Sequence, residues 1–347
     1  MVRLWDCQGR SEVVALKGHR SDIIQVAFDP SSRKLASVST DGTLRLWDLS
    51  SGESLHVLSE GDGGLLALSF SPDGSMVAAG GNDLVVWIWD VRTGEKLMAL
   101  EGVRYPIHSV EFDPAGRFIV AGGGNSSYHG GVSHFWDLRS GEPMPSLETH
   151  PTIVFDHAFS SDGDLMASAS HQDLVKIWDL PEHRQIQELK GHMHNVYAVD
   201  FSHDDRRLAS AGSDGLLRIW DTADGTELAA LSGHTGTVHG LAFAPDDQFL
   251  ISGGTDAMVR FWDTRSLSEV GQDAMIYRTR MVELEGQVAA WMDQADGNQE
   301  LVLALLDRRI ADSNELDTRV LRNLVLRALV ERRNAFDAGT EAPDDAT

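Results

Sequence analysis

The dipeptide Trp-Asp recurs along most of the chain at a nearly constant interval. It occurs seven times, beginning at Trp5, Trp47, Trp89, Trp136, Trp178, Trp220 and Trp262. The successive intervals are 42, 42, 47, 42, 42 and 42 residues. A fixed period of this length indicates an array of supersecondary units, each of which buries its apolar residues only against its neighbours.

Each unit contains four short strand patterns separated by turn residues. Residues 23–28 illustrate the first pattern, and a second pattern of small residues (LASVS, LASAG) follows a turn rich in Pro, Gly and Asp. The third ends in Trp-Asp, and a weaker fourth (SLHVL, ELAAL) precedes the next unit, which in several cases begins with Gly-His. Four strands in about 40–45 residues match one blade of a β-propeller. Residues 1 to about 270 therefore resemble the WD-repeat family, which implies an all-β WD-repeat β-propeller.

The resemblance also implies a hydrogen-bonded set of four side chains in each blade. The set comprises the His of Gly-His, a Ser in the second strand, an Asp in the next turn and the Trp. Three units carry all four residues, namely His19, Ser37, Asp41 and Trp47; His192, Ser210, Asp214 and Trp220; and His234, Ser252, Asp256 and Trp262. A catalytic Ser-His-Asp triad needs an exposed nucleophile on a sharp turn. Because these serines fall within strand patterns, we expect a structural set and no catalytic residues.

The three middle units depart from this pattern. Gln172 replaces the Asp in the unit that ends at Trp178, which keeps His150 and Ser168. The unit ending at Trp89 keeps only Asp83 beside the Trp, with Gly61 and Ala79 at the other two positions. The unit ending at Trp136 has Val103, Ala121 and Asn125, and it also carries the five-residue insertion. We expect these blades to have lost stabilising hydrogen bonds.

The first unit begins at its third strand, because residues 2–6 form the Trp-Asp strand and residues 12–16 the fourth. One interpretation is an incomplete seven-bladed ring of six complete blades plus half a blade, which fits the C-terminal part of a longer protein. The other is that six blades close alone, with residues 1–17 packed on as an extra edge. We favour the incomplete ring.

Residues 271–347 change to a helical apolar pattern, for example Leu316, Val320, Leu324 and Ala328. The sequence thus predicts a propeller over residues 1–270 and a short helical tail over residues 271–347. The tail is either a docking helix for a partner or a cap over the incomplete blade, since an amphipathic stripe says only that something covers it.

Composition narrows the classes of partner. The formal net charge of −24 disfavours nucleic acid and anionic membranes, and it favours basic protein partners if it serves recognition at all. Cys7 is the only cysteine, and no apolar segment reaches membrane-spanning length, so we expect a cytoplasmic protein. The run from His192 to His194 lacks further ligands, and we expect no metal and no cofactor.

The family pattern also places a channel mouth on the face that carries the Gly-His loops, called the top face. It is lined by the residue five positions after each Gly-His histidine or its equivalent. The segment that contains the insertion, residues 125–131, should project on this face beside the preceding loop. The candidate partner-binding residues are Asp22, Arg104, Tyr105, His108, Tyr128, His129, Phe155, Tyr197 and His239. The alternative is that these residues only fill space.

The expected function is a non-catalytic protein-interaction scaffold whose top face binds protein or peptide partners. An alternative is a regulatory or sensor module of a larger signalling enzyme, such as a WD-repeat Ser/Thr kinase. Self-association through the incomplete blade or the tail is a further expectation, because unpaired strand edges attract other chains.

Overall fold

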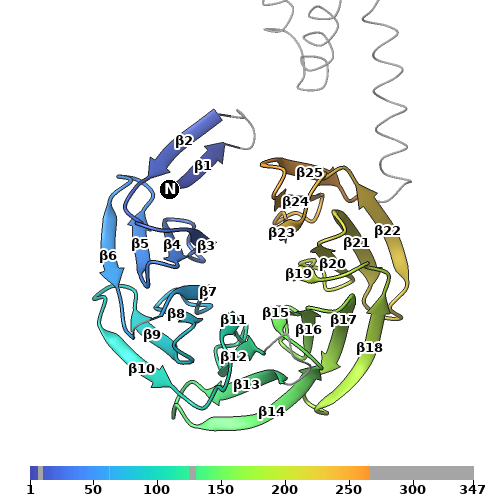
Figure 1. Ribbon diagram of the computed structural model, residues 1–347, viewed down its shortest axis with the longest axis horizontal. Coiled ribbons are helices and arrows are strands. Elements are labelled where there is room, and N and C mark those ends of the chain that lie inside the picture. Colours follow the sequence, from blue (N-terminus) through green and yellow to red (C-terminus); the bar gives the residue numbers. More distant parts are fainter. Residues whose placement is uncertain (7–10, 62, 125–129, 266–347) are drawn as a thin grey trace, which may run out of the picture. The chain divides into compact units, whose positions relative to one another are not determined.

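The computed structural model describes residues 1–6, 11–61, 63–124 and 130–265. These residues form seven antiparallel sheets arranged around a central channel (Figure 1). The chain divides into two compact units, Met1–Thr264 and Arg265–Thr347, of which the first contains all the sheets. Within the described ranges no helix is long and apolar enough to cross a membrane.

Each full blade has four strands that follow one another in the chain and in the sheet. The sheets with four strands are β3 (Ile23–Phe28), β4 (Lys34–Ser39), β5 (Leu44–Asp48) and β6 (Ser54–Leu58); β7 (Leu65–Phe70), β8 (Met76–Gly81), β9 (Val86–Asp90) and β10 (Lys96–Leu100); β11 (Ile107–Phe112), β12 (Phe118–Gly123), β13 (Gly131–Asp137) and β14 (Pro143–His150); β15 (Val154–Phe159), β16 (Leu165–Ser170), β17 (Leu174–Asp179) and β18 (Arg184–Lys190); and β19 (Val196–Phe201), β20 (Arg207–Gly212), β21 (Leu216–Asp221) and β22 (Glu227–Ser232).

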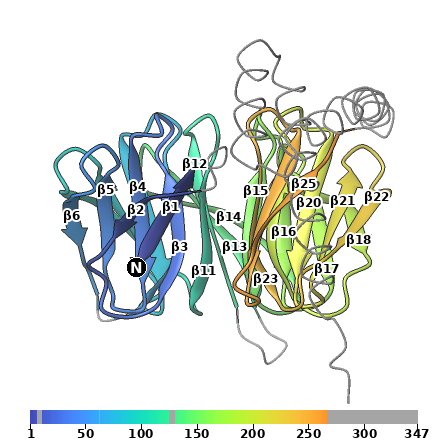
Figure 2. The same cartoon turned by 90° about the horizontal axis from the view of Figure 1, so that it is seen from above.

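The first and last sheets have fewer strands. The first pairs only β1 (Val2–Asp6) with β2 (Ser11–Leu16), and the last contains β23 (Val238–Phe243), β24 (Phe249–Gly254) and β25 (Val259–Asp263). The first strand of each blade lies at the channel and the fourth at the circumference (Figure 1). Figure 2 shows the ring from the side, with the strands running between its two faces.

The core lies between neighbouring blades, where the second strands supply small residues. In one cluster Val110 and Phe112 of β11 pack against Ala78 of β8 and Ile88 of β9. The first strand of one blade lies very close to the second strand of the blade before it. A Cβ atom on Gly80 of β8, for example, would lie only 2.7 Å from the Ile107 side chain of β11. The small-residue pattern of the second strands is therefore a packing requirement, since overfilling such a contact forces strain.

The predicted all-β propeller of six blades and half a blade is confirmed, and the ring is open between β1 and β25 (Figure 1). The sixth blade has three strands among the described residues, because its fourth would fall after Asp263. The interpretation in which six blades close alone is wrong, because apolar side chains on β3 and β25 stay exposed at the two ends. The predicted helical tail, residues 271–347, lies outside the described residues.

Candidate functional site

The three complete four-residue sets are assembled within their blades. Trp220 Nε1 donates to Ser210 Oγ at 2.8 Å, and the same Oγ lies 2.8 Å from His192 Nε2. His192 Nδ1 lies 3.0 Å from the Asp214 carboxylate. Since the carboxylate accepts, Nδ1 carries the proton and Nε2 accepts from the serine hydroxyl. Equivalent contacts join the sets that contain Trp47 and Trp262.

Burial fixes the charges in these sets. It lowers the pKa of His192, while hydrogen bonds from Met193 N–H, Leu216 N–H and His192 outweigh burial and hold the pKa of Asp214 below its usual value. The pair therefore consists of a neutral imidazole and a carboxylate at neutral pH. Ser210 is completely buried, so its hydroxyl has no space beside it for a substrate. The geometry is that of a structural set.

Two of the altered blades keep part of the four-residue set, and the structure shows which hydrogen bonds the remaining side chains make. His150 Nε2 lies 2.8 Å from Ser168 Oγ, but its Nδ1 is buried without a partner because Gln172 replaces the aspartate. Asp83 accepts from Trp87 Nε1 at 2.6 Å and lies against Gly61, in the space that a histidine would need. Trp87 thus gives Asp83 one hydrogen bond, although the histidine and serine of the family set are absent from this blade.

The blade with the insertion contains a buried network that sequence reasoning missed. His157 of β15 lies between two serines of the preceding blade, with Nδ1 2.9 Å from Ser109 Oγ and Nε2 2.8 Å from Ser133 Oγ. Ser133 also contacts Thr149 Oγ1 at 3.1 Å. All four side chains are buried. The available signal was a single histidine at a position where the other first strands have Val or Leu.

Four predicted channel-mouth residues form a continuous row of rings across neighbouring first strands. The ring centroids of His108 and Phe155 are 5.7 Å apart, those of Phe155 and Tyr197 4.7 Å, and those of Tyr197 and His239 4.8 Å. Asn195 Nδ2 donates to the Tyr197 hydroxyl at 3.0 Å, which fixes one ring. The rings are half-buried except for His239, which is exposed. Such a row offers an apolar face with polar edges to a ligand.

The remaining predicted residues do not join this row. Arg104 and Tyr105 line a separate cavity of about 620 Å³ beside β13 and β14, the outer strands of the blade with the insertion. His134 and Trp136 line it as well. Burial, and then the charge of Arg104, lower the pKa of His134. Asp22 precedes β3 at the open end of the ring, and its backbone carbonyl accepts from Thr40 N–H. Tyr128 and His129 lie outside the described residues.

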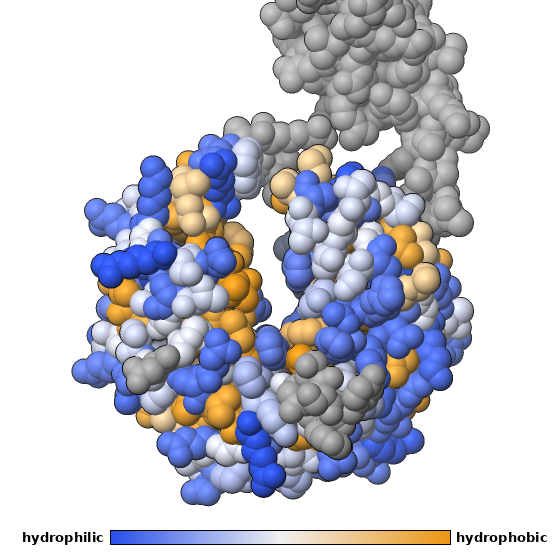
Figure 3. All heavy atoms as spheres, viewed as in Figure 1, coloured by the Kyte–Doolittle hydropathy of each residue, from blue (hydrophilic) through white to orange (hydrophobic). Residues whose placement is uncertain are grey.

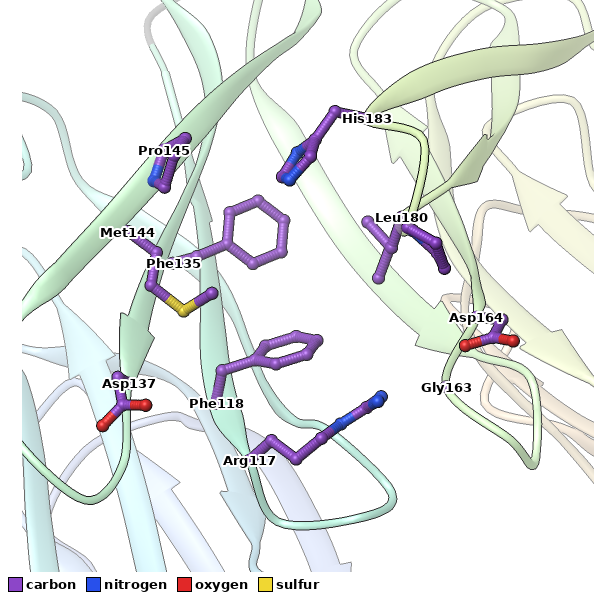
Figure 4. Close-up of a pocket in the computed structure, with 11 residues that line it drawn as sticks. Arg117, Phe118, Phe135, Asp137, Met144, Pro145, Gly163, Asp164, Leu180 and His183 are labelled. Atoms are coloured by element: carbon purple, nitrogen blue, oxygen red, sulfur yellow. The ribbon is translucent and has the colours of Figure 1, made fainter.

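A second groove lies on the opposite face, at the turns that follow the first and third strands of two blades. It has a volume of about 280 Å³, and its floor includes Phe118, Phe135 and Leu180 (Figure 4). The centroids of Phe118 and Phe135 are 5.8 Å apart. Arg117 at the rim is already bound by both carboxylate oxygens of Asp113, so its charge is satisfied within the blade.

Three carboxylic acids line up lower on the same first strands as the aromatic row. Asp156 accepts from Val199 N–H at 3.0 Å and Asp200 from Phe243 N–H at 2.7 Å, which links neighbouring inner strands. Burial, and then the charge of Asp156, raise the pKa of Glu111 to about 8. Burial also raises the pKa of Asp156 to about 7 and that of Asp200 to about 6. Among the described residues no group of three or more potential ligands could hold a metal ion.

These acids predict a contribution to stability that falls as pH rises from about 4 to about 8. A pKa raised by folding contributes stability that is complete below the unfolded value, near 4, and is lost as pH passes the folded values. The buried histidines act in the opposite direction, because the pKa of His150 and of His157 is lowered by burial to about 3. Their contribution is lost as pH falls below about 6.5. The two effects oppose each other between about pH 4 and 6.5, and only the decline caused by the acids remains between about pH 6.5 and 8, where we expect the melting temperature to fall.

Glu111→Gln provides the check on that assignment. The amide keeps the shape of the neutral acid, so the variant should melt higher than the wild type at pH 8 and should lose part of the decline between pH 6 and 9. Melting curves over pH 4–9 measure this, with Glu95→Gln, a surface change, as the control. An unchanged decline in Glu111→Gln would show that folding does not raise the pKa of this carboxyl.

A comparison with protein-family models matches five segments of the chain to the model described as WD domain, G-beta repeat. The matched residues are 10–48, 52–90, 141–179, 183–221 and 225–263. Residues 91–140, which include the insertion, the first three strands of its blade and the two serines that contact His157, fall between two matched segments. No curated protein matches the chain in a sequence comparison.

Proposed function

Because the chain belongs to the WD domain, G-beta repeat family, we propose that it is a non-catalytic scaffold whose channel mouth binds a peptide segment of a partner protein. Propellers of this family generally serve as scaffolds for protein interactions. The observation that carries the proposal is the row of rings from His108 to His239, which spans four neighbouring first strands.

The chemistry of the mouth favours one kind of ligand. Aromatic side chains that remain partly exposed are typical anchors at protein interfaces, because they bury a large area at small entropic cost. The overall charge of −24 favours positive charge on the ligand. We therefore propose a peptide with one apolar or aromatic anchor beside a Lys or Arg.

Peptides selected from a random displayed library against the whole chain can test this. Fluorescence polarisation should show that the double variant Phe155→Ala with Tyr197→Ala binds the selected peptides at least about tenfold more weakly, as for a loss of more than 1.4 kcal/mol at an anchor. Met144→Ala, in the groove of Figure 4, is the matched control and should bind normally. Selected peptides that bind the double variant as well as the wild type, or that fail only on Met144→Ala, would contradict the proposal.

A further inference from the structure

The first end of the ring exposes apolar side chains whose counterparts are buried. Val26 and Phe28 of β3 are 45% and 54% exposed. Leu68 of β7 occupies the position of Val26 and is 1% exposed, and Phe112 of β11 occupies the position of Phe28 and is 3% exposed. A contiguous apolar surface of this kind marks an interaction site.

The last end shows the same feature on its opposite side. Val259 and Phe261 of β25 are 62% and 52% exposed. Their counterparts Val86 and Ile88 of β9 are completely buried. Figure 3 shows the channel continuing into a gap between the two ends, with apolar residues along the wall on the side of β3.

The repeats of the chain show what covers each of these faces. Leu68 and Phe70 of β7 pack against Ala36 and Val38 of β4 and against Leu46 of β5. By analogy, the face of β3 takes a second and a third strand. The third is present as β1, whose Val2 and Leu4 cluster with Ile23 of β3, whereas no described strand takes the place of the second.

The face of β24 and β25 takes a first strand by the same reasoning. Phe243 and Val238 of β23 pack against Ala209, Ala211 and Leu217 of the preceding blade, and that arrangement repeats between the other blades. Among the described strands, none takes the places of a first and a second strand, which lie side by side here, and consecutive strands of this kind form a hairpin in every complete blade.

Trp5 adds a directional group to the same place. It is 54% exposed, whereas the corresponding Trp220 is 2% exposed under the second strand of its blade. In four blades this indole N–H donates to a serine of the second strand, at 2.8 to 3.0 Å. Of the strands that the structure describes, β1 pairs only with β2, so none of them occupies its other edge, where backbone donors and acceptors can pair with a further strand.

We propose that the open sector binds a β-hairpin of a partner polypeptide, which completes a four-stranded blade with β1 and β2. Its first strand carries apolar side chains against Val259 and Phe261. Its second strand pairs antiparallel with β1, carries a Ser or Thr for Trp5, and consists of Ala, Gly and Ser.

Steric limits support this composition. A Cβ atom on Gly122 of β12 would lie 2.5 Å from the His157 ring and 2.9 Å from Val154, so bulky residues do not fit on this side of a second strand. An α-helix, about 10 Å across with its side chains, is too wide for a place that neighbouring strands fill at about 4.8 Å spacing.

A hairpin taken from the chain itself is the probe. A copy of residues 192–215, which include β19 and β20, is joined to Met1 of the full chain through a flexible Gly/Ser linker. Closing the blade should raise the melting temperature by at least about 5 °C, as a gain of a few kcal/mol would. It should also shift Trp5 fluorescence to the blue, measured as the difference from the same fusion with Trp5→Phe.

Two matched variants give the proposal its controls. A fusion with Ala209→Arg and Ala211→Arg in the added copy should gain nothing. The pair Phe28→Asp with Phe261→Asp in the recipient, at sites that are exposed and so tolerate charge, should abolish the gain. Equal stabilisation by the two fusions, or an unchanged Trp5 signal, would overturn the proposal.

A third arm presents the hairpin on a separate carrier protein. Binding measured by calorimetry should be lost in the Phe28→Asp, Phe261→Asp recipient and kept in the Phe155→Ala, Tyr197→Ala variant. The second result separates this surface from the channel mouth, so each proposal can fail alone. Absence of binding in trans would overturn the partner hairpin, as would a dimer of the wild-type chain that Val26→Asp dissociates.

Discussion

Trp220→Ala is expected to lower the free energy of unfolding by about 3–5 kcal/mol, whereas Trp5→Ala should lower it by about 1 kcal/mol or less. The two residues occupy the same position of the repeat. Trp220 is 2% exposed, and its indole N–H donates to Ser210. Its ring packs against the buried apolar residues of the preceding blade, β15–β18. Trp5 is 54% exposed, so its removal neither opens a cavity nor strands a buried hydroxyl.

Urea titrations followed by circular dichroism measure the difference, because the midpoint shifts with stability when the slope is constant. Trp47→Ala should behave like Trp220→Ala, since its indole makes the same contact with Ser37. Equal midpoints for Trp5→Ala and Trp220→Ala would contradict the assignment of Trp5 to an unfinished blade.

The sequence was sufficient to predict the blades because it carries two regular patterns at once, the interval between Trp-Asp pairs and the alternation of apolar residues within each strand. The Trp-Asp interval fixes where each third strand ends, and the alternation within LRLWD or LRIWD fixes which side chains are buried. The His, Ser, Asp and Trp sets are repeated at constant spacing, so three blades reveal them together.

Contacts between blades were harder to predict. Ser109 and His157 are separated by 48 residues, and no repeated pattern relates them, since the described residues contain this network between one pair of blades. Trp87 and Asp83 are close in sequence, but their bond depends on the space left by Gly61. The channel-mouth positions were predicted from the repeat, whereas the stacking of Phe155 on Tyr197 depends on how the first strands converge at the channel. The binding role of these residues stays a prediction.

His157→Leu should lower the free energy of unfolding by about 2–3 kcal/mol, because the change leaves buried hydroxyls without their partner. Leucine occupies this position in β7 and β23, so the larger part of the loss should be polar and not steric. Ser109 Oγ would keep no hydrogen-bond partner that the structure provides for it, while Ser133 Oγ would keep Thr149.

The triple variant His157→Leu, Ser109→Ala, Ser133→Ala distinguishes this cause from simple loss of fit. Replacing every member of a buried polar group by apolar residues can be nearly neutral, so the triple variant should recover to within about 1 kcal/mol of the wild type. It should also lose less stability between pH 6.5 and 4, because the pKa of His157, about 3 in the folded chain, opposes protonation there. A triple variant less stable than His157→Leu alone would mean that the serines stabilise the blade by another route. Recovery would mean that this blade, which lacks the His, Ser and Asp of the complete sets, is joined to the next blade by a network whose members matter only in combination.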